Sequence, residues 1–138
     1  MGIESSLEVR KAVIPRLRAS SSLTALVPAE RIYPPRTPAE PDWPFIRYGQ
    51  PDTAPFRATG IDGAEIDFSV HTFSKAPGED EASRINAAVV ATLDGAVLDL
   101  PGGFKAHITW TGGQVIPDGG DPDAWHAFST FRARVVTF

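Results

Sequence analysis

The clearest pattern in this chain is the alternation of apolar and polar residues between positions 65 and 71. Apolar residues stand at Ile66, Phe68 and Val70, and around them come Glu65, Asp67, Ser69 and His71. A period of two is typical of a half-buried antiparallel strand, because successive side chains of a strand point to opposite faces of the sheet. The pattern therefore predicts a strand in which Glu65, Asp67 and His71 share one polar face.

A second alternating segment ends the chain, from about Trp125 to Thr137. Its two sets of positions are Ala127, Ser129, Phe131, Ala133 and Val135 on one side, and Phe128, Thr130, Arg132, Arg134 and Val136 on the other. Shorter apolar runs at 31–33, 45–48 and 104–111 also predict strands. The sheet is thus expected to have about five strands.

Three segments have the pattern of helices. From residue 5 onward Val9, Val13 and Leu17 share a helical face, and Ser5 with Glu8 forms a capping-box pattern. Pro15 removes one internal hydrogen bond, so a kink or an early end is expected there. A short helix capped by residues 20–22 follows. Acidic residues at 79–81 begin a third helix, whose buried positions are expected to be Ile85, Ala88, Val89, Thr92, Leu93 and Ala96.

Prolines and glycines interrupt these elements. Residues 34–44 hold five prolines, which predicts a long extended loop. The segment 49–60 is broken by two more prolines, and a turn is expected at 61–63. Residues 111–113 read as a hairpin signal. The order is helix, short helix, three strands, helix, two strands, which predicts a single α+β domain over residues 1–138, with a mainly antiparallel sheet and helices packed on one face.

Composition narrows the possible functions. The chain has no cysteine, so disulfides and thiolate chemistry are excluded, and a reducing cytoplasm suits its synthesis. No apolar run is long enough to predict a membrane span. The net charge of −4 argues against a protein that binds nucleic acid by neutralising phosphates.

No residue pattern predicts catalysis, a metal or a cofactor. His71, His107 and His126 lack metal-ligand spacing, and no phosphate loop or nucleophile elbow is present. The loop 118–123 has three carboxylates but lacks the spacing of a calcium loop. A polar pocket near Glu65, Asp67 and His71, in a small cytoplasmic ligand-binding or enzymatic domain, remains an alternative.

Aromatic residues in irregular segments are the better candidates for a functional surface. Trp43 lies in the proline-rich loop, Phe56 in the broken segment and Trp125 beside the acidic loop. Large rings bury much area at little entropic cost, so these positions are expected at an interface unless the loops fold back onto the core. Arg57, next to Phe56, offers a fork of donors for a carboxylate partner.

An ordered set of short fragments gives the chain a family resemblance. The fragments are Arg31-Ile32-Tyr33-Pro34-Pro35, Pro44-Phe45-Ile46-Arg47-Tyr48, Leu100-Pro101-Gly102-Gly103, Asp121-Pro122-Asp123, and His126 with Phe131-Arg132-Ala133-Arg134-Val135 after an amphipathic N-terminal segment. In this order the chain resembles the tail-terminator (tail-completion) proteins of long-tailed bacteriophages and gene transfer agents.

The resemblance implies a structural role in a virion, with synthesis in a bacterial host cytoplasm. It implies a homohexameric ring that caps the tail tube, contacts the major tail tube protein and a neck or stopper protein, and lets DNA pass through its lumen without specific binding. A different neck connector or a tail tube subunit is the nearest alternative. The family is too divergent for any invariant functional residue to be carried over to this sequence.

Overall fold

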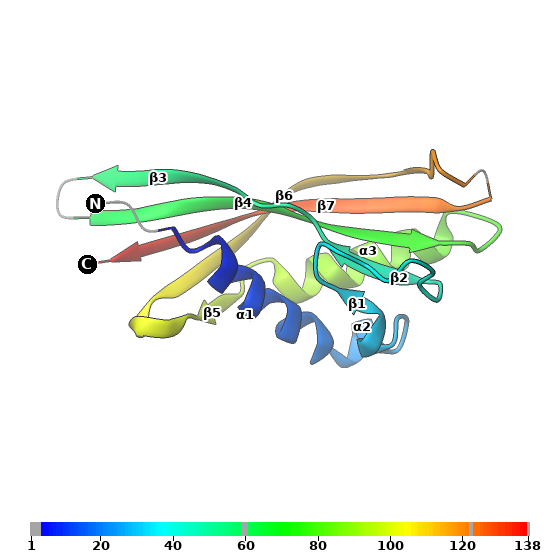
Figure 1. Ribbon diagram of the computed structural model, residues 1–138, viewed down its shortest axis with the longest axis horizontal. Coiled ribbons are helices and arrows are strands. Elements are labelled where there is room, and N and C mark those ends of the chain that lie inside the picture. Colours follow the sequence, from blue (N-terminus) through cyan, green and yellow to red (C-terminus); the bar gives the residue numbers. More distant parts are fainter. Residues whose placement is uncertain (1–3, 59–60, 122, 138) are drawn as a thin grey trace.

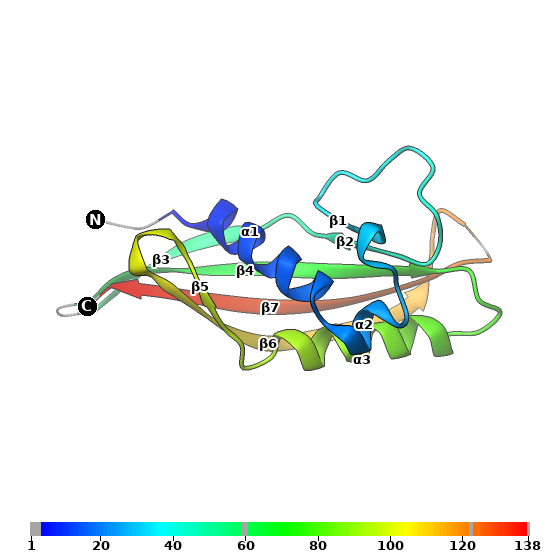
Figure 2. The same ribbon diagram turned by 90° about the horizontal axis from the view of Figure 1, so that it is seen from below.

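The computed structural model of the protein describes residues 4–58, 61–121 and 123–137. It is a mixed α+β fold in which the helices lie on one side of a curled sheet (Figure 1, Figure 2). The elements are α1 (Ser6–Arg18), α2 (Ser21–Thr24), β1 (Ile32–Tyr33), β2 (Phe45–Tyr48), β3 (Asp52–Ala58), β4 (Ile61–Ser74), α3 (Asp80–Leu93), β5 (Val97–Asp99), β6 (Lys105–Pro117) and β7 (Trp125–Thr137), with short 3₁₀ turns at Ala29–Arg31 and Pro101–Gly103.

The sheet has seven strands in the order β1-β2-β4-β7-β6-β5, and β3 also pairs with β4. β4 is the central strand of the sheet. β7 pairs antiparallel with one of its edges along nearly its whole length, and β3 and β2 pair with the first and last parts of its other edge. The prediction of an α+β domain is confirmed, but the count of about five strands is wrong. The sheet is also not purely antiparallel, because β1 and β2 are parallel.

The two unexpected strands are β3 and β5. Pro51 and Pro55 suggested a broken segment at 49–60, yet Asp52–Ala58 pairs with β4 in regular register. Proline cannot donate to a ladder but is tolerated on an edge strand, and β3 has a partner on one side only. The turn expected at 61–63 is wrong, since β4 begins at Ile61. The connection at 59–60 lies outside the described residues.

β6 is longer than expected, because the chain does not turn at 111–113. The register with β7 shifts between Trp110 and Gly112, so Thr111 forms a bulge and the strand continues to Pro117. A Cβ at position 113 would collide with the carbonyl oxygen of Phe128, so only glycine allows β7 to approach here.

The helices agree with their patterns except at the start of α1 and the end of α3, which stops at Leu93, so that Ala96 is buried outside the helix. Ser5 makes no side-chain capping bond, and a carboxylate oxygen of Glu4 instead accepts from the backbone N–H of Ser6 at 2.7 Å. The helix continues three residues past the exposed Pro15 and so does not end early. In α2 the hydroxyl of Ser20 accepts from the N–H of Leu23, as expected for a cap.

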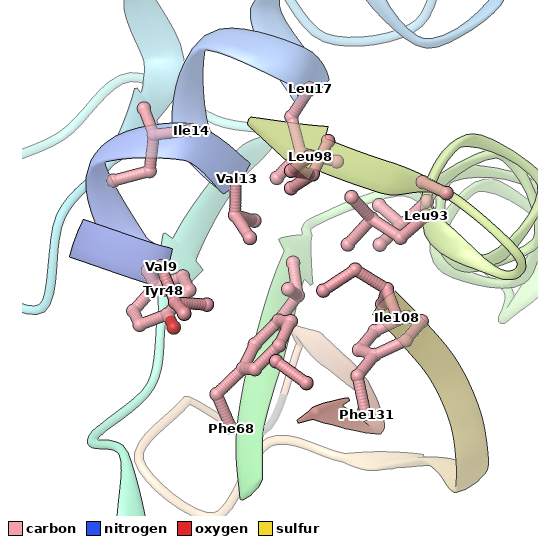
Figure 3. Packing of buried hydrophobic residues seen from close by; sticks show 14 of the residues in the cluster. Val9, Val13, Ile14, Leu17, Tyr48, Phe68, Leu93, Leu98, Ile108 and Phe131 are labelled. Atoms are coloured by element: carbon pink, nitrogen blue, oxygen red, sulfur yellow. The ribbon is translucent and has the colours of Figure 1, made fainter. Parts of the chain in front are cut away.

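The core fills the space between the helices and the sheet (Figure 3). α1 contributes Val9, Val13, Ile14 and Leu17, and α3 contributes Ala82, Ile85, Val89 and Leu93. From the sheet, Phe68 and Phe131 stack on each other with ring centres 5.4 Å apart. Alternate residues of β4 and β7 are buried here, as their patterns predicted. No helix in the described ranges has the length and apolar character needed to cross a membrane.

Candidate interface on the open face of the sheet

In the described part of the chain, one face of the sheet is covered by no helix, and we call it the open face (Figure 1). It carries the odd-numbered side chains of β4 and the even-numbered side chains of β7, opposite in direction to the buried set. Glu65, Asp67 and His71 therefore lie on it. Sheets commonly expose one face to water, so exposure alone does not make this face a binding site. Its side chains do.

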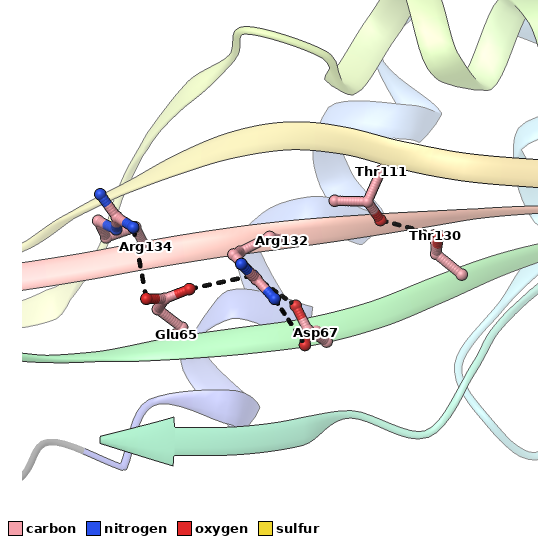
Figure 4. A network of polar contacts seen from close by, with 6 residues as sticks. All are labelled: Glu65, Asp67, Thr111, Thr130, Arg132 and Arg134. Atoms are coloured by element: carbon pink, nitrogen blue, oxygen red, sulfur yellow. Dashed lines mark hydrogen bonds and ion pairs between the residues drawn. The ribbon is translucent and has the colours of Figure 1, made fainter. Parts of the chain in front are cut away.

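Charged side chains form a network near the middle of the open face (Figure 4). Nε of Arg132 lies 3.0 Å from carboxylate oxygens of both Glu65 and Asp67, and Nη2 of Arg134 lies 3.3 Å from Glu65. The bond to Asp67 and the two nearby carboxylates raise the pKa of Arg132. Exposed ion pairs contribute little to stability, about 0–1 kcal/mol each. The network therefore matters more for the charge that this surface presents.

The charges of this network are separated by strand. Acidic residues stand on β3 and β4, where Asp52 is aligned with Asp67 and Glu65 lies on the same face. Basic residues stand on β7 at Arg132 and Arg134. Arg47 of β2, aligned with His71, adds a basic group on the other side of β4. The open face therefore carries both signs, and its central charges are paired within the subunit.

Phe56 and Arg57 point to opposite sides of β3. Phe56 is partly buried on the open face, with the guanidinium carbon of Arg134 4.5 Å from its ring centre. Arg57 is exposed on the other side and lies 3.6 Å from a carboxylate oxygen of Asp62. Adjacent residues of a strand diverge in this way, so the two side chains do not form one patch.

Aromatic rings cluster at the far end of the open face. Trp43 packs edge-on against Phe45, with ring centres 5.0 Å apart, and Phe45 stacks on Phe73, with ring centres 4.8 Å apart. The ammonium of Lys75 lies 4.7 Å from the ring centre of Trp43. The proline-rich loop thus folds back and places Trp43 on the sheet, where it is partly buried. Trp125 is also partly buried, but it is aligned with Ser74 at the start of β7 and so lies on the helical side of the sheet, apart from this cluster.

Two histidines far apart in sequence meet beside this cluster. Nδ1 of His71 lies 2.8 Å from Nε2 of His126, and Nε2 of His71 lies 2.7 Å from the hydroxyl of Ser69. The pKa of His71 is lowered to about 4, mainly by burial and further by the charge of Arg47 and by the electrostatic effect of His126. Burial also lowers the pKa of His126, opposed by Asp118 and assisted by Arg47. Both histidines are therefore neutral near pH 7, which suits a pair that shares one hydrogen bond.

Acidification should destabilise the protein through this pair. The pKa of His71 is 6.5 when unperturbed and about 4 in the fold, so the unfolded chain binds the proton more tightly. Stability is then lost as the pH falls from about 6.5 to about 4. We expect the melting temperature of His71→Phe to fall less steeply over this range than that of the wild type. His107→Phe, at an exposed histidine of β6, is the control and should keep the wild-type slope; equal slopes for all three proteins would contradict the prediction.

Sequence reasoning did not find the meeting of His71 with His126, because 55 positions separate them. Only the β4–β7 register could have revealed it. His107 lines a separate open-face hollow of about 310 Å³ with Thr109, Thr111, Arg132 and Arg134. In the described part of the chain no three His, Cys, Asp or Glu side chains are grouped to hold a metal ion.

Comparison with known proteins gives a consistent answer. The sequence profile of the family described as "Tail completion protein gp17" matches residues 11–136. A solved chain from the "Virion of native gene transfer agent (GTA) particle" is 26% identical, with 99% of this chain and 100% of that chain covered, at a TM-score of 0.86. Another solved chain, 20% identical over 99% of this chain and 98% of its own, has a TM-score of 0.60 and shares the fold alone. No curated protein matches the sequence significantly.

Proposed function

This chain belongs to the tail completion protein gp17 family, and from that membership we propose that it forms a six-membered ring that caps the tail tube and joins it to the neck. Family and structural neighbour make it a structural protein of a phage-like virion tail. The observation that carries the proposal is the likeness, over 99% of the chain, to a subunit of a gene transfer agent particle.

Termination by a ring follows from geometry. One face of the ring matches the last layer of the tube, while the opposite face accepts no further tube subunit and instead binds a neck or stopper protein. Such a ring needs a head-to-tail contact that closes on itself, so each subunit must present two unlike surfaces. The open face supplies one of these surfaces, with its charged network and the aromatic cluster at its far end. Phe56 adds apolar area beside the charged network, and Trp43 lies in the aromatic cluster.

The proposal also assigns the DNA a passive passage through the lumen. A channel for DNA must not bind phosphates strongly, and the net charge of −4 suits that requirement. The arginines of β7 are already paired with Glu65 and Asp67, so they offer little free positive charge. No cofactor or membrane takes part in the proposed function.

The test is to produce particles from which this protein is deleted. We expect tail tubes of uncontrolled length that do not join heads, because nothing stops polymerisation at the correct layer. Restored protein should appear at the tube end as a six-fold ring of about 89 kDa, from copies of 14.8 kDa. Tubes of normal length that merely fail to attach would instead indicate a neck connector. Another symmetry at the tube end would overturn the hexamer.

A further inference from the structure

The sheet has two long edges, and they differ in how well they are protected. Exposed strand edges attract other strands, and proteins normally block them with charges, prolines or very short strands. β3 is blocked in this way by Asp52, Pro55 and Arg57. The outer edge of β6 is not.

Among the described strands, none pairs with the outer edge of β6 in its second half. β5 and the turn before it cover its outer edge from Lys105 to Ile108, and the carboxylate of Asp94 accepts from the N–H of Trp110. β7 occupies its other side. Between Lys105 and Asp118 the sequence has no Asp, Glu, Lys or Arg. Seven of the nine residues from 109 to 117 are exposed, and Trp110 and Ile116 are exposed by 45% and 38%.

The part of the β6 edge that could pair with another strand begins after the bulge at Thr111. From Gly112 to Pro117 the register with β7 is regular, so this stretch is an extended and continuous strand. Pro117 has no backbone N–H, and the carbonyl oxygen of Gly112 already accepts from the indole N–H of Trp110 at 2.9 Å. An added strand along Gly112–Ile116 would therefore pair with the remaining backbone groups of this stretch. Gly112 and Gly113 have no side chain that would hinder the approach of a second backbone.

We propose that the outer edge of β6, at Gly112–Ile116, accepts one extended segment from another protein of the particle, which adds a strand to the sheet. Addition of a strand to an exposed edge is a common mode of peptide recognition, with affinity from backbone hydrogen bonds. This inference adds a partner-binding edge to the proposed function. It depends on the proposed function only for the location of the partner within the particle.

A second copy of this chain is a poor source for the added strand. Its loop 34–44 holds five prolines that cannot donate hydrogen bonds, and its free edge at β3 is blocked by Pro55. Pairing of β6 with β6 would join identical surfaces, which a head-to-tail ring does not do. The strand therefore comes from a different protein.

The surroundings of the edge describe the partner. Uncharged residues on β6 favour an uncharged, apolar segment, since a charge placed against Ile116 would lose its hydration. Asp118 and Asp123 follow at the tip of the β6–β7 hairpin. They favour a Lys or Arg next to the added strand.

The first test is a map of the native particle that contains the wild-type protein. We expect backbone density from a different protein about 4.8 Å from Gly112–Ile116, the spacing of paired strands. An unpaired edge, or a second copy of this chain beside it, would overturn the proposal. The same map gives the symmetry and position of the protein independently, so the strand can be found even if the ring at the tube end is not.

The second test compares two lysine variants. Ile116→Lys places a charge on the bare edge, whereas Val97→Lys makes the same kind of change at a residue of β5 that is exposed by 48%. We expect Ile116→Lys to lower incorporation into particles at least tenfold per folded molecule, and Val97→Lys to match the wild type. Equal incorporation of both variants would overturn the proposal. If Ile116→Lys fails to fold, the wild-type map decides.

Discussion

Replacement of Phe131 by alanine is expected to lower the free energy of unfolding by about 3–5 kcal/mol. Phe131 is fully buried in β7 and stacks on Phe68, whose ring in turn stacks on Tyr48 at 5.1 Å. Its removal leaves a cavity under α3 that the two long strands cannot close. The free energy of unfolding of a domain is only about 5–15 kcal/mol, so the variant should lose a large part of it. Chemical denaturation of both proteins measures the difference.

The matched control is Phe128→Ala, three positions earlier on the same strand. Phe128 is only partly buried and lies on the open face, where its ring contacts His71 and His126. Its truncation exposes no core and should cost clearly less. If Phe128→Ala destabilised the protein as much as Phe131→Ala, the open face would have to be regarded as a second core and not as an interface.

The faces of the two long strands were predictable from sequence because their patterns are purely local. Alternation at 65–71 and 125–137 assigned the side chains in the middle of β4 and along β7 to one of two faces, and burial agrees. The period-two signal is strong here because one side is packed under helices while the other is open.

Strand β3 and the second half of β6 could not be predicted because pairing overrides local preference there. Pro55 is a strand breaker in general, and it is tolerated only because β3 lies at an edge. Thr111-Gly112-Gly113 has the composition of a turn, but the bulge against β7 lets the strand continue. The edge position of β3 and the bulge in β6 both depend on how the strands pair, which these residues do not determine by themselves.

The candidate interface was predictable only in part. Placement of Glu65, Asp67 and His71 on one face followed from periodicity. Their partners did not, because Arg132, Arg134 and His126 come from β7 and depend on register. The opposite orientations of Phe56 and Arg57 also needed the strand assignment of β3, which the prolines concealed.

Phe56→Ala is expected to weaken ring assembly by about 1–3 kcal/mol per subunit contact while the monomer stays folded. Within the monomer the ring of Phe56 lies outside the buried core cluster, and the guanidinium of Arg134 lies over it. An exposed cation–π contact is worth about 0.5–1 kcal/mol, so thermal unfolding of the monomer should change little. Each subunit of a ring carries the defect, so the loss is repeated at every contact.

Native mass spectrometry of assembled and free protein measures the effect on assembly, and two further variants make it specific. Leu7→Ala removes a side chain that is exposed by 46% on the helical side, and should leave assembly unchanged. Trp43→Ala should reduce both assembly and stability, because Trp43 packs on Phe45 and Phe73 within the monomer. A large drop in melting temperature for Phe56→Ala, with normal assembly of the folded fraction, would place its ring in the core and remove β3 from the interface.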